Sequence, residues 1–427
     1  WPKGKGSIMT IATLGEARHP SPVAWTVSDE ARLPLDVVRE PNKAPSDIEF
    51  EVAGPRAKLY FDPRKVTAGI VTCGGLCPGL NNVIRSLFME MYHVYDVRQV
   101  LGFRNGYQGL DPHGGGEPIA LTCELVDNIH LRGGTILGTS RGPVDVGRAV
   151  DNLVKRGVNI LFTIGGDGTQ RGANDLYQEA RRRGHALSVV GVPKTIDNDV
   201  AFVARSFGFL SAVEAATKVL ECAHTEAHSI ENGVSIVKLM GRHAGFIAGE
   251  ATVASQDVNF TLIPEIPFKL EGENGFLACL KRRMLRRGHA LVVVAEGAGQ
   301  DLLANTGGQK DASGNVKLKD IGTFLRDQVE AYFKAEKAPV TLRYIDPSDT
   351  IRSVPANAED AILCDLYARN AVHAAMAGKT GLVVGYLHDQ FIHVPIELLT
   401  SRKKQIDPAG GAWHAVLATT GQPPVFG

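Results

Sequence analysis

The chain has 427 residues, and its 46 Lys and Arg balance its 46 Asp and Glu, so the formal net charge is zero. This balance gives no reason to expect nucleic acid or an anionic membrane as a general partner. No run of 18 or more apolar residues occurs, so we expect no membrane span. The length predicts two or three lobes rather than one compact unit. Six cysteines in so long a chain are not a disulfide scaffold and favour a reducing compartment, so we expect a cytoplasmic protein.

Residues 1–65 are rich in proline and poor in periodic apolar segments, which is typical of an extended arm or cap. We expect this extension to be a packing or flexible element without chemistry of its own. The first buried strand is predicted at residues 68–75, and a glycine-rich turn at 74–82 then opens a helix that runs to residue 96. Such a strand, loop and helix either present backbone amides to a phosphate or merely turn the chain.

Further strands and helices alternate, which is the order of a doubly wound α/β fold. A strand and turn at residues 97–110 carry Tyr107, which is either a stacking surface for a base or ordinary lobe packing. A glycine-punctuated loop at 131–143 carries Arg141, whose guanidinium either grips a phosphate or lies in solvent. A helix predicted at 146–157 leads into the central strand.

Two apolar runs, residues 160–169 and 187–199, each end in a polar loop. Because ligands gather beyond the carboxyl ends of parallel strands, we expect both loops to meet at one site. Glycines leave backbone amides uncovered in the first loop, and the helix predicted at 172–184 favours anions at its N-terminus. Asp167 cannot itself hold a phosphate, and a carboxylate among phosphates indicates a bridging Mg²⁺.

The second loop contributes two carboxylates, Asp197 and Asp199, which are two residues apart. One of them can accept a hydroxyl proton while the other supports a metal or orientation. Taken alone, an Asp-Asn-Asp loop is usually only a turn. Together with the first loop it predicts phosphoryl transfer, in which positioning and charge neutralisation do most of the catalysis.

A helix predicted at residues 206–229 should cross to a second lobe. A strand at 233–246 delivers Arg242, which either meets an anionic substrate or caps the following helix, and a strand at 290–299 delivers Glu296, whose carboxylate could accept hydrogen bonds from sugar hydroxyls.

Later in the chain, Arg343 and Arg352 flank an Asp-Pro-Ser turn, which predicts two arginines converging on one phosphate. A helix at 358–380 and a strand at 381–387 should rebuild the first kind of lobe. Residues 300–320 are polar and glycine-rich, and we expect a surface insertion there.

Seven segments resemble the phosphofructokinase family, in the right order over residues 66 to about 400: TCGGLCPGLN, GGTILGTSRGP, TIGGDGTQRGA, PKTIDND, KLMGR, AEGAGQDLL and YIDPSDTIRS. The GGDGT element also occurs in NAD kinases and lipid kinases, but those families lack TIDND and MGR at these spacings. The preceding AGPRAKLYFDPRKV is similar to the extension of the long plant-like and trypanosomal-like branch.

The resemblance implies an α/β fold of two Rossmann-like lobes with mainly parallel sheets and an active site in the cleft between them. It divides the chain into four parts: an N-terminal extension at 1–65, a donor (ATP) lobe at 66–208 with 351–400, a fructose 6-phosphate lobe at 209–350, and a C-terminal tail at 401–427.

The resemblance also implies the 6-phosphofructokinase reaction of glycolysis, in which ATP and fructose 6-phosphate give ADP and fructose 1,6-bisphosphate, with Mg²⁺ as cofactor. It implies an allosteric homo-oligomer, a dimer or a tetramer. In that picture Asp197 is the base that accepts the proton of the attacking hydroxyl, Asp167 is the metal ligand, and the other catalytic residues are Thr195, Asp199 and Arg242.

Two sets of binding residues follow from the resemblance. ATP would be held by Gly75, Tyr107, Arg141, Gly166, Asp167, Gly168 and Thr169. The sugar phosphate would be held by Thr195, Ile196, Asp197, Met240, Gly241, Arg242, Glu296, Arg343, Asp349 and Arg352. Among these, Arg343 matches a basic position that the family often supplies from a neighbouring subunit.

Donor choice depends on Gly168 and Lys194. Relatives that use pyrophosphate place an aspartate at the first position, where its side chain would intrude on the nucleotide α-phosphate, so Gly168 favours ATP. A lysine before TIDND also marks the pyrophosphate users, so a pyrophosphate-dependent phosphofructokinase is the competing hypothesis. The mixture of Gly168 with Lys194 resembles the long-branch ATP enzymes. Two further hypotheses are a catalytically silent regulatory subunit of the same fold and a NAD or lipid kinase.

Two positions depart from family patterns. The short bacterial ATP enzymes carry an arginine nine residues before the MGR arginine, whereas this chain has Gly233 there, as in the long branch, so phosphate binding must be built differently. Asp349 stands where the long branch commonly has tyrosine. Its carboxylate could pair with Arg352 or repel the sugar phosphate.

Overall fold

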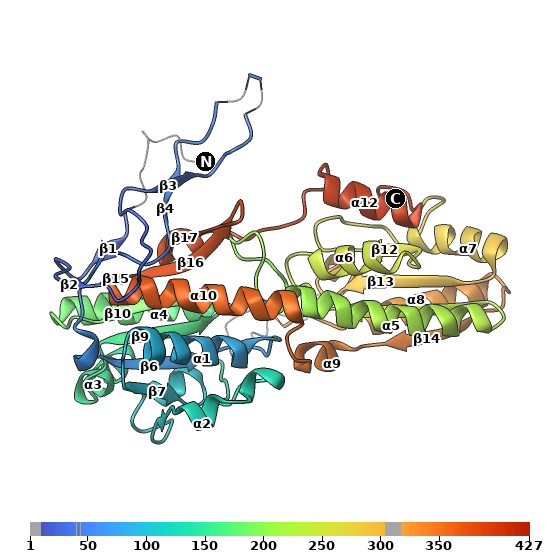
Figure 1. Ribbon diagram of the computed structural model, residues 1–427. Helices are drawn as coiled ribbons and strands as arrows, with labels where there is room; N and C mark the ends of the chain where they lie inside the picture. The colour runs from blue at the N-terminus through green and yellow to red at the C-terminus, as the bar shows by residue number, and fades with distance from the viewer. Residues whose placement is uncertain (1–9, 40, 43, 304–316) are drawn as a thin grey trace. The chain divides into compact units, whose positions relative to one another are not determined.

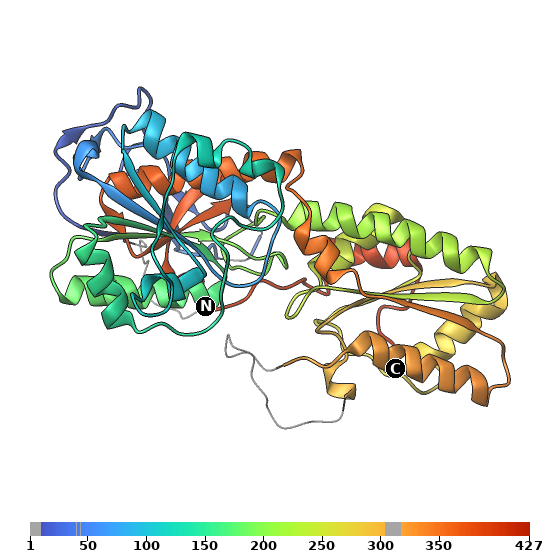
Figure 2. The same cartoon turned by 90° about the horizontal axis from the view of Figure 1, so that it is seen from below.

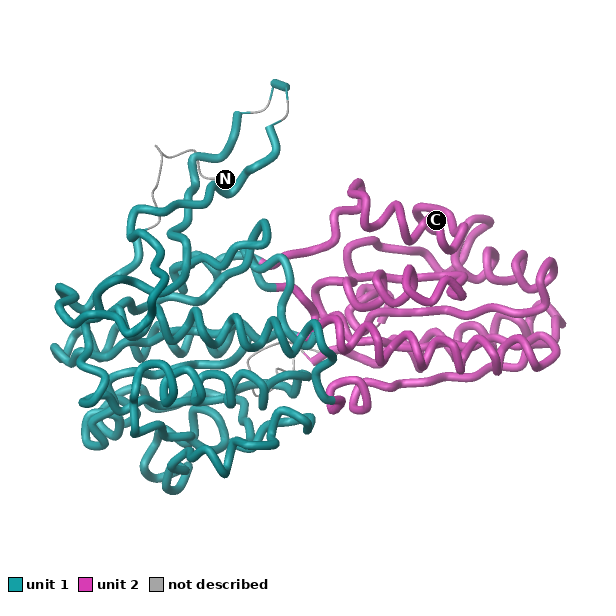
Figure 3. The backbone as a smooth tube through the Cα atoms, in the orientation of Figure 1, with its two compact units in different colours: residues 1–195, 200–208, 355–402 teal, residues 196–199, 209–354, 403–427 magenta. Residues whose placement is uncertain are grey.

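The computed structural model describes residues 10–39, 41–42, 44–303 and 317–427. Residues 1–9 of the expected extension and residues 304–316 of the expected insertion lie outside the described part. The chain forms two compact units (Figure 3). Unit 1 comprises residues 1–195, 200–208 and 355–402, and unit 2 comprises residues 196–199, 209–354 and 403–427.

Unit 1 is built on a nine-stranded mixed sheet of order β3-β4-β17-β16-β10-β9-β6-β7-β8. The five strands from β16 to β7 are parallel, and the flanking strands are antiparallel to their neighbours. Every residue of β6, β9 and β10 is buried, as expected for continuous apolar runs in a parallel sheet. The strands are β3 (Arg32–Pro34), β4 (Glu49–Val52), β6 (Thr67–Thr72), β7 (Gln99–Phe103), β8 (Ile119–Ala120), β9 (Ile160–Gly165), β10 (Ser188–Pro193), β16 (Leu382–Leu387) and β17 (Gln390–Pro395).

Helices cover both faces of this sheet (Figures 1 and 2). Helices α1 and α10 pack against each other on one face, and α3 and α4 pack together on the other. The helices are α1 (Leu80–Met89), which continues as the π-helix η2 (Glu90–Val94), α2 (Cys123–Val126), α3 (Val146–Lys155), α4 (Asp167–Arg182), α10 (Ala358–Met376) and α11 (Ile396–Leu399). Short 3₁₀ helices are η1 (Pro63–Lys65), η3 (Gly106–Leu110) and η4 (Ile129–Leu131).

Two small ladders involve the N-terminal region, and the first of them joins it to the rest of unit 1. Strand β1 (Ala12–Thr13) pairs with β15 (Lys379–Thr380), and β2 (His19–Pro20) pairs with β5 (Lys58–Leu59). Strands β3 and β4 of the expected extension at 1–65 also add to the edge of the large sheet, where β4 pairs with β17.

Unit 2 is built on a four-stranded parallel sheet of order β12-β13-β11-β14. Helices α5 and α6 pack on one face, and α7 and α8 cover the other over a core of aliphatic and phenylalanine side chains. The strands are β11 (Gly233–Leu239), β12 (Phe260–Leu262), β13 (Ala290–Ala295) and β14 (Thr341–Ile345). The helices are α5 (Phe209–Ser229), α6 (Phe246–Ser255), α7 (Phe276–Arg287), the 3₁₀ helix η5 (Gln300–Leu302), α8 (Ile321–Ala335), α9 (Ser348–Ser353) and α12 (Gly411–Thr420).

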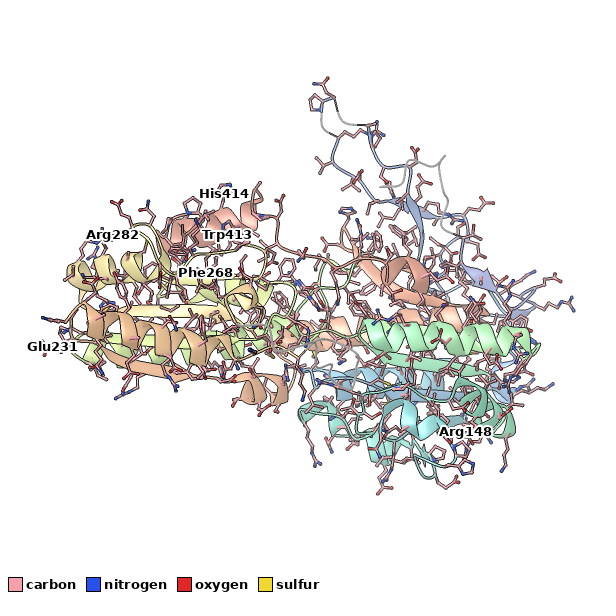
Figure 4. All side chains as sticks on the ribbon, turned by 180° about the vertical axis from the view of Figure 1, so that it is seen from behind. Arg148, Glu231, Phe268, Arg282, Trp413 and His414 are labelled. Atoms are coloured by element: carbon pink, nitrogen blue, oxygen red, sulfur yellow. The ribbon has the colours of Figure 1, made fainter. Side chains whose placement is uncertain are left out.

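The residues expected to form a C-terminal tail, 401–427, contain a helix that packs on unit 2. Helix α12 lies against α6 and buries Trp413, which is 2% exposed, whereas the neighbouring His414 is exposed (Figure 4). Val416 on the same helix is 1% exposed, so two apolar side chains anchor α12 to unit 2.

Two expectations from composition can be compared with the described residues. No described helix combines the length and the apolar character needed to cross a bilayer. All six cysteines lie in the described part of the chain, and none of them forms a disulfide.

Candidate functional site

Three loops leave the same edge of the large sheet in unit 1. Strands β9 and β10 are neighbours with Gly165 opposite Pro193, and the Lys194 amide donates to the Gly165 carbonyl at 3.0 Å. Strand β6 lies on the other side of β9, with Thr72 opposite Ile164. Strands β9 and β10 therefore end at the same edge of the sheet of unit 1, where ligands of such sheets gather.

The loop after β9 turns at once into α4. A Cβ on Gly165 would lie 2.2 Å from the Thr169 Oγ1, so only glycine fits at this tight strand-to-helix turn. Gly166 is the N-cap, and α4 begins at Asp167, five residues before the predicted start at 172. Asp167, Gly168 and Thr169 therefore form the first helical turn, whose backbone amides favour anions.

Gly168 is exposed in that first turn and has room for a side chain. The nearest atom to a Cβ built there is the Arg171 Nη2, at 4.0 Å. Asp167 next to it is half-buried, and Thr169 is 7% exposed. The protein itself therefore does not require glycine at position 168.

Sequence reasoning missed Gln170, which ties the ends of β9 and β10 together. Its side chain is 1% exposed, and its Nε2 donates to the Gly165 carbonyl at 3.0 Å and to the Val192 carbonyl at 3.4 Å. A Cβ on Gly191 would lie 2.2 Å from the Gln170 Oε1, so the glycine in β10 makes room for this amide. An isolated glycine inside a buried strand was the available signal.

The loop after β6 is held against the loop that carries Arg141. The Gly74 amide donates to the Ser140 carbonyl at 3.1 Å, and a Cβ on Gly75 would lie 3.3 Å from the Arg141 Nη2. Lys194 is 6% exposed, and its Nζ donates to the Gly75 carbonyl at 2.6 Å. Within unit 1, Gly75, Arg141 and Lys194 thus lie together.

Tyr107 supports the first turn of α4 from inside the lobe. Its ring is 6% exposed and packs so closely on Gly172 that a Cβ there would lie 2.6 Å from the ring. Its hydroxyl donates to the Thr169 carbonyl. Burial raises the pKa of Tyr107 well above its ordinary value, so the hydroxyl stays protonated as a donor. Lobe packing, one of the two interpretations of this residue, thus describes its contacts.

In unit 2 the loops after β11 and β13 are joined at the sheet edge. The Glu296 amide donates to the Leu239 carbonyl at 2.9 Å, and the Gly297 amide donates to the Gly241 carbonyl at 3.0 Å. A Cβ on Gly297 would lie 2.0 Å from the Arg242 carbonyl oxygen. Glu296 and the Met-Gly-Arg loop therefore sit side by side, as two neighbouring parallel strands would place them.

Asp197 belongs to the short segment 196–199 of unit 2 and contacts this same loop. The Arg242 amide donates to the Asp197 Oδ2 at 3.3 Å. Burial, the negative charge of Asp199 and that of Glu296 raise the pKa of Asp197 to about 7, although the Arg242 amide and the Arg352 charge act in the opposite direction. A carboxyl group in this range is suited to general base catalysis near neutral pH.

The residues around Asp197 shape its turn. Thr195 is the last residue of unit 1 before the segment, and its carbonyl accepts a hydrogen bond from the Ser206 Oγ at 2.7 Å. Ile196 is 9% exposed. Asn198 has a φ of 55°, a left-handed conformation that asparagine tolerates better than most residues.

The two arginines that were predicted to converge have different partners within this chain. The Arg352 Nε contacts the Met240 sulfur at 3.0 Å, whereas the Arg343 Nε lies 3.5 Å from the Glu226 Oε1. Asp349 is exposed in the first turn of α9. An ion pair between Asp349 and Arg352 does not occur among the described residues.

Asp199 has partners that sequence reasoning missed. The Lys403 Nζ lies 2.6 Å from the Asp199 Oδ2, and the Lys404 amide donates to the Asp199 carbonyl at 2.9 Å. Asp199 is 4% exposed. A buried carboxylate requires compensating charge, and the residues expected to form a tail supply it.

A metal cage made of protein side chains alone does not occur in the described ranges, since no group of three or more His, Cys, Asp or Glu residues there is arranged to hold an ion. Mg²⁺ binds one or two carboxylates of a protein and takes its remaining ligands from water and substrate phosphates. Asp167, half-buried in the first turn of α4, is a carboxylate of that kind.

The family model for phosphofructokinase matches residues 67–375. The chain is 48% identical to an ATP-dependent 6-phosphofructokinase of Amycolatopsis methanolica, over 98% of this chain and 96% of the relative. It is 50% identical to the ATP-dependent 6-phosphofructokinase of Trypanosoma brucei brucei, over 88% of this chain and 77% of the relative. It is 47% identical to the chloroplastic ATP-dependent 6-phosphofructokinase 5 of Arabidopsis thaliana, over 87% of this chain and 68% of the relative.

Solved structures share the fold at low sequence identity. A pyrophosphate-dependent phosphofructokinase of Marinobacter aquaeolei matches with a TM-score of 0.69 and 22% identity, over 84% of this chain and 93% of that chain. The phosphofructokinase of Pichia pastoris in the T-state matches with a TM-score of 0.65 and 24% identity, over 83% of this chain and 37% of that chain.

Proposed function

The chain belongs to the phosphofructokinase family, and from this premise we propose that it is an ATP-dependent 6-phosphofructokinase. The enzyme transfers the γ-phosphate of ATP to the 1-hydroxyl of D-fructose 6-phosphate and gives ADP and fructose 1,6-bisphosphate, a step of glycolysis. The observation that carries the choice of ATP is Gly168, because its position in the first turn of α4 is open.

On the acceptor side, Asp197 would take the proton of the sugar hydroxyl as its oxygen attacks the γ-phosphorus. Its raised pKa supports this role, because a base whose pKa lies near the working pH is available in its ionised form and still binds a proton well. Arg242 and Arg352 would neutralise negative charge on the sugar phosphate and on the transferred group. Glu296 would accept hydrogen bonds from sugar hydroxyls.

On the donor side, the amides of Gly166 and Gly168 and the guanidinium of Arg141 would hold the phosphates of ATP. The N-terminus of a helix that follows a glycine-rich turn is a suitable anion site because its first amides lack helical partners. Tyr107 would act by supporting this turn, since its hydroxyl bonds to the Thr169 carbonyl.

Asp167 would hold the Mg²⁺ ion together with phosphate oxygens of the donor. When bound there, Mg²⁺ neutralises charge on the donor phosphates. The position of Asp167 in the first helical turn supports this assignment, because the amides around it would bind the phosphates that complete the coordination of the ion.

We also propose a homo-oligomer, a dimer or a tetramer. Arg343 supports this proposal, because it lies on the edge strand β14 with a side chain that is 52% exposed. Its guanidinium is thus available to a neighbouring subunit. The cytoplasmic location stays a prediction from the cysteine content, and one of the relatives described above is named as chloroplastic.

The pyrophosphate-dependent hypothesis is favoured by one observation, the presence of Lys194. Its ammonium group lies at the carbonyl of Gly75, beside Arg141, where it adds positive charge to the predicted phosphate site. In the pyrophosphate users, the charge of the lysine at this position would replace part of what the nucleotide contributes. ATP remains the preferred donor because position 168 lacks the aspartate that would obstruct the nucleotide.

The test compares ATP with pyrophosphate as the donor for fructose 6-phosphate in the wild type and in Gly168→Asp. We expect the wild type to prefer ATP, and we expect the variant to lose roughly ten- to a hundredfold in kcat/KM for ATP because like charges face each other. Gly411→Asp is a matched control, since Gly411 also lies in the first turn of a helix with open space at its Cβ.

A wild type that strongly prefers pyrophosphate would establish the pyrophosphate-dependent hypothesis. Wild-type turnover at the background rate, in a folded sample with either donor, would identify a catalytically silent subunit. A Gly168→Asp variant that uses ATP as well as the Gly411→Asp control does would show that position 168 does not face the nucleotide.

A further inference from the structure

The segment 403–406, which follows directly after unit 1, binds the segment that carries Asp197. The Lys403 Nζ forms an ion pair with the Asp199 Oδ2 at 2.6 Å, and the Lys404 amide donates to the Asp199 carbonyl at 2.9 Å. Side-chain and main-chain contacts therefore fix Asp199 at two points. All of these residues belong to unit 2.

The same segment also binds the loop that follows the Met-Gly-Arg motif. The Gln405 Nε2 donates to the His243 carbonyl at 2.8 Å, and the Ile406 amide donates to the Glu265 Oε1 at 2.9 Å. Glu265 in turn accepts from the Gly245 amide at 3.0 Å. Four consecutive residues thus connect the segment 196–199 with the loop 240–245.

We propose that Lys403 is a positioning residue for phosphoryl transfer, which holds Asp199 and thereby sets the carboxylate of Asp197 against the amide of Arg242. The inference rests on the proposed function, since it assigns Asp197 the role of the base. Lys403 acts through Asp199 and does not touch the reacting atoms. No motif of the family resemblance includes Lys403.

Lys403 should affect the pKa of Asp197, because it neutralises the charge of Asp199. The charged groups that face Asp197 are Asp199 and Glu296, which raise its pKa, and Arg352, which lowers it. Lys403 neutralises Asp199 at 2.6 Å, and Lys404, whose own pKa burial lowers to about 8, also faces Asp199. Removing the charge of Lys403 leaves the negative potential of Asp199 less balanced, so the pKa of Asp197 rises further.

The experiment compares the wild type with Lys403→Met, which keeps the length of the side chain and removes its charge. We expect kcat to fall by about tenfold, the KM for ATP to change by less than about threefold, and the acid limb of the kcat profile to move up by about half a pH unit or more. Lys403→Arg restores the charge and should recover most of kcat and the wild-type acid limb.

Lys218→Met is the matched control, because Lys218 forms an ion pair with Glu214 on the exposed surface of α5 in the same unit. It should leave kcat and the pH profile unchanged. A Lys403→Met enzyme with the wild-type profile and kcat would overturn the inference. So would a variant whose kcat falls in step with a lowered melting temperature while its acid limb stays in place, because that result describes a purely structural residue.

The outcome separates this inference from the function on which it rests. A wild type without turnover of ATP and fructose 6-phosphate would refute the proposed function, and the inference would fall with it. Wild-type turnover together with an unaltered Lys403→Met enzyme would refute the inference alone.

Discussion

The backbone amide of Arg242 donates a hydrogen bond to the Asp197 Oδ2 at 3.3 Å, which joins two motifs that lie 45 residues apart in the sequence. The bond orients the carboxylate of Asp197. Burial and the negative charges of Asp199 and Glu296 disfavour its ionised form and raise its pKa. The hydrogen bond from Arg242 lowers the pKa of Asp197, whereas burial and the two nearby carboxylates raise it. Their net effect determines the pH at which this group can act as a base.

The first prediction concerns the acid limb of the rate. Because the pKa of Asp197 is raised to about 7 and only the ionised form accepts a proton, kcat should fall as the pH decreases below about 7. The measurement is kcat at saturating ATP and fructose 6-phosphate from about pH 5 to 9.

Asp199→Asn tests whether the charge of Asp199 raises the pKa of Asp197. Removing the charge that raises the pKa of Asp197 should move the acid limb to lower pH, opposite in sign to the shift expected for Lys403→Met. A profile that stays flat down to about pH 5 would mean that Asp197 titrates like an ordinary carboxyl group, and it would contradict the assignment.

The second prediction is that Asp197→Asn lowers kcat and raises the free energy of unfolding. Losing the base should lower kcat by about 10²–10⁴-fold. A raised carboxyl pKa means that the unfolded state ionises more readily than the folded state, so the wild type is penalised increasingly from its unfolded pKa of 3.8 up to about 7, and fully above that pH. The variant should therefore gain on the order of 1–3 kcal/mol in the free energy of unfolding at pH 8, and less at pH 5.

Urea unfolding at the two pH values measures this gain. Asp327→Asn, at an exposed site on α8, is the control and should leave the free energy of unfolding nearly unchanged. A gain that is equal at both pH values would show that the effect does not come from the charge of Asp197.

Much of the fold follows from local pattern. The runs that form β6, β9 and β10 are apolar at nearly every position because both faces of this sheet are covered by helices, so they are recognisable as buried strands. The start of α4 was predicted five residues too late, because glycines at 165, 166 and 168 indicate a loop. In the structure Gly165 ends β9, Gly166 is the N-cap of α4 and Gly168 lies in its first turn.

Some residues of the candidate site can be predicted from the sequence pattern, and others cannot. Asp167, Asp197 and Arg242 stand at the ends of strands, where the topology of parallel sheets directs polar residues towards ligands. Lys403 lies 204 residues from Asp199 in the sequence, and a lysine in a polar segment is indistinguishable from a solvated one until the chain folds. The contact of Lys403 with Asp199 depends on long-range packing, so the sequence around Lys403 could not predict it.

The third prediction concerns the glycine of the Met-Gly-Arg motif. Gly241 has a φ of 127°, and a Cβ there would lie 2.6 Å from the Ala244 carbonyl oxygen. Gly241→Ala should lower the free energy of unfolding by about 1–3 kcal/mol and raise the KM for fructose 6-phosphate, because the loop that presents Arg242 must shift. Urea unfolding and steady-state kinetics measure the two effects.

Gly411→Ala is the control for Gly241→Ala, since Gly411 has open space and lies in a helix, where alanine is favoured. It should be neutral or slightly stabilising and should leave the KM unchanged. A Gly241→Ala enzyme that matches this control would contradict the close approach at this turn.

A buried charge cluster ties the N-terminal region to the rest of unit 1. Glu51 on β4 receives three contacts at its Oε1, from the Arg56 Nη2 at 2.7 Å, the Lys379 Nζ at 2.6 Å and the His393 Nδ1 at 2.9 Å. Each of the four side chains is less than a tenth exposed. Burial alone would raise the pKa of Glu51, but the hydrogen bonds and charges of His393 and Lys379 hold it well below its ordinary value.

The fourth prediction is that Glu51→Gln lowers the free energy of unfolding by about 3–5 kcal/mol at pH 7, because it removes the buried carboxylate that Arg56 and Lys379 share. The two cations then keep only the carboxylate of Asp29, whose side chain is 70% exposed. A depressed carboxyl pKa contributes stability that is complete above the unfolded value of 4.5 and is lost as the pH falls towards the folded value. The difference between the wild type and the variant should therefore shrink on acidification below about pH 4.5. Glu16→Gln, which removes an exposed pair with Arg18, should show neither effect in the same urea titrations, and a Glu51→Gln variant that matches it would mean that the cluster does not stabilise the attachment of β4.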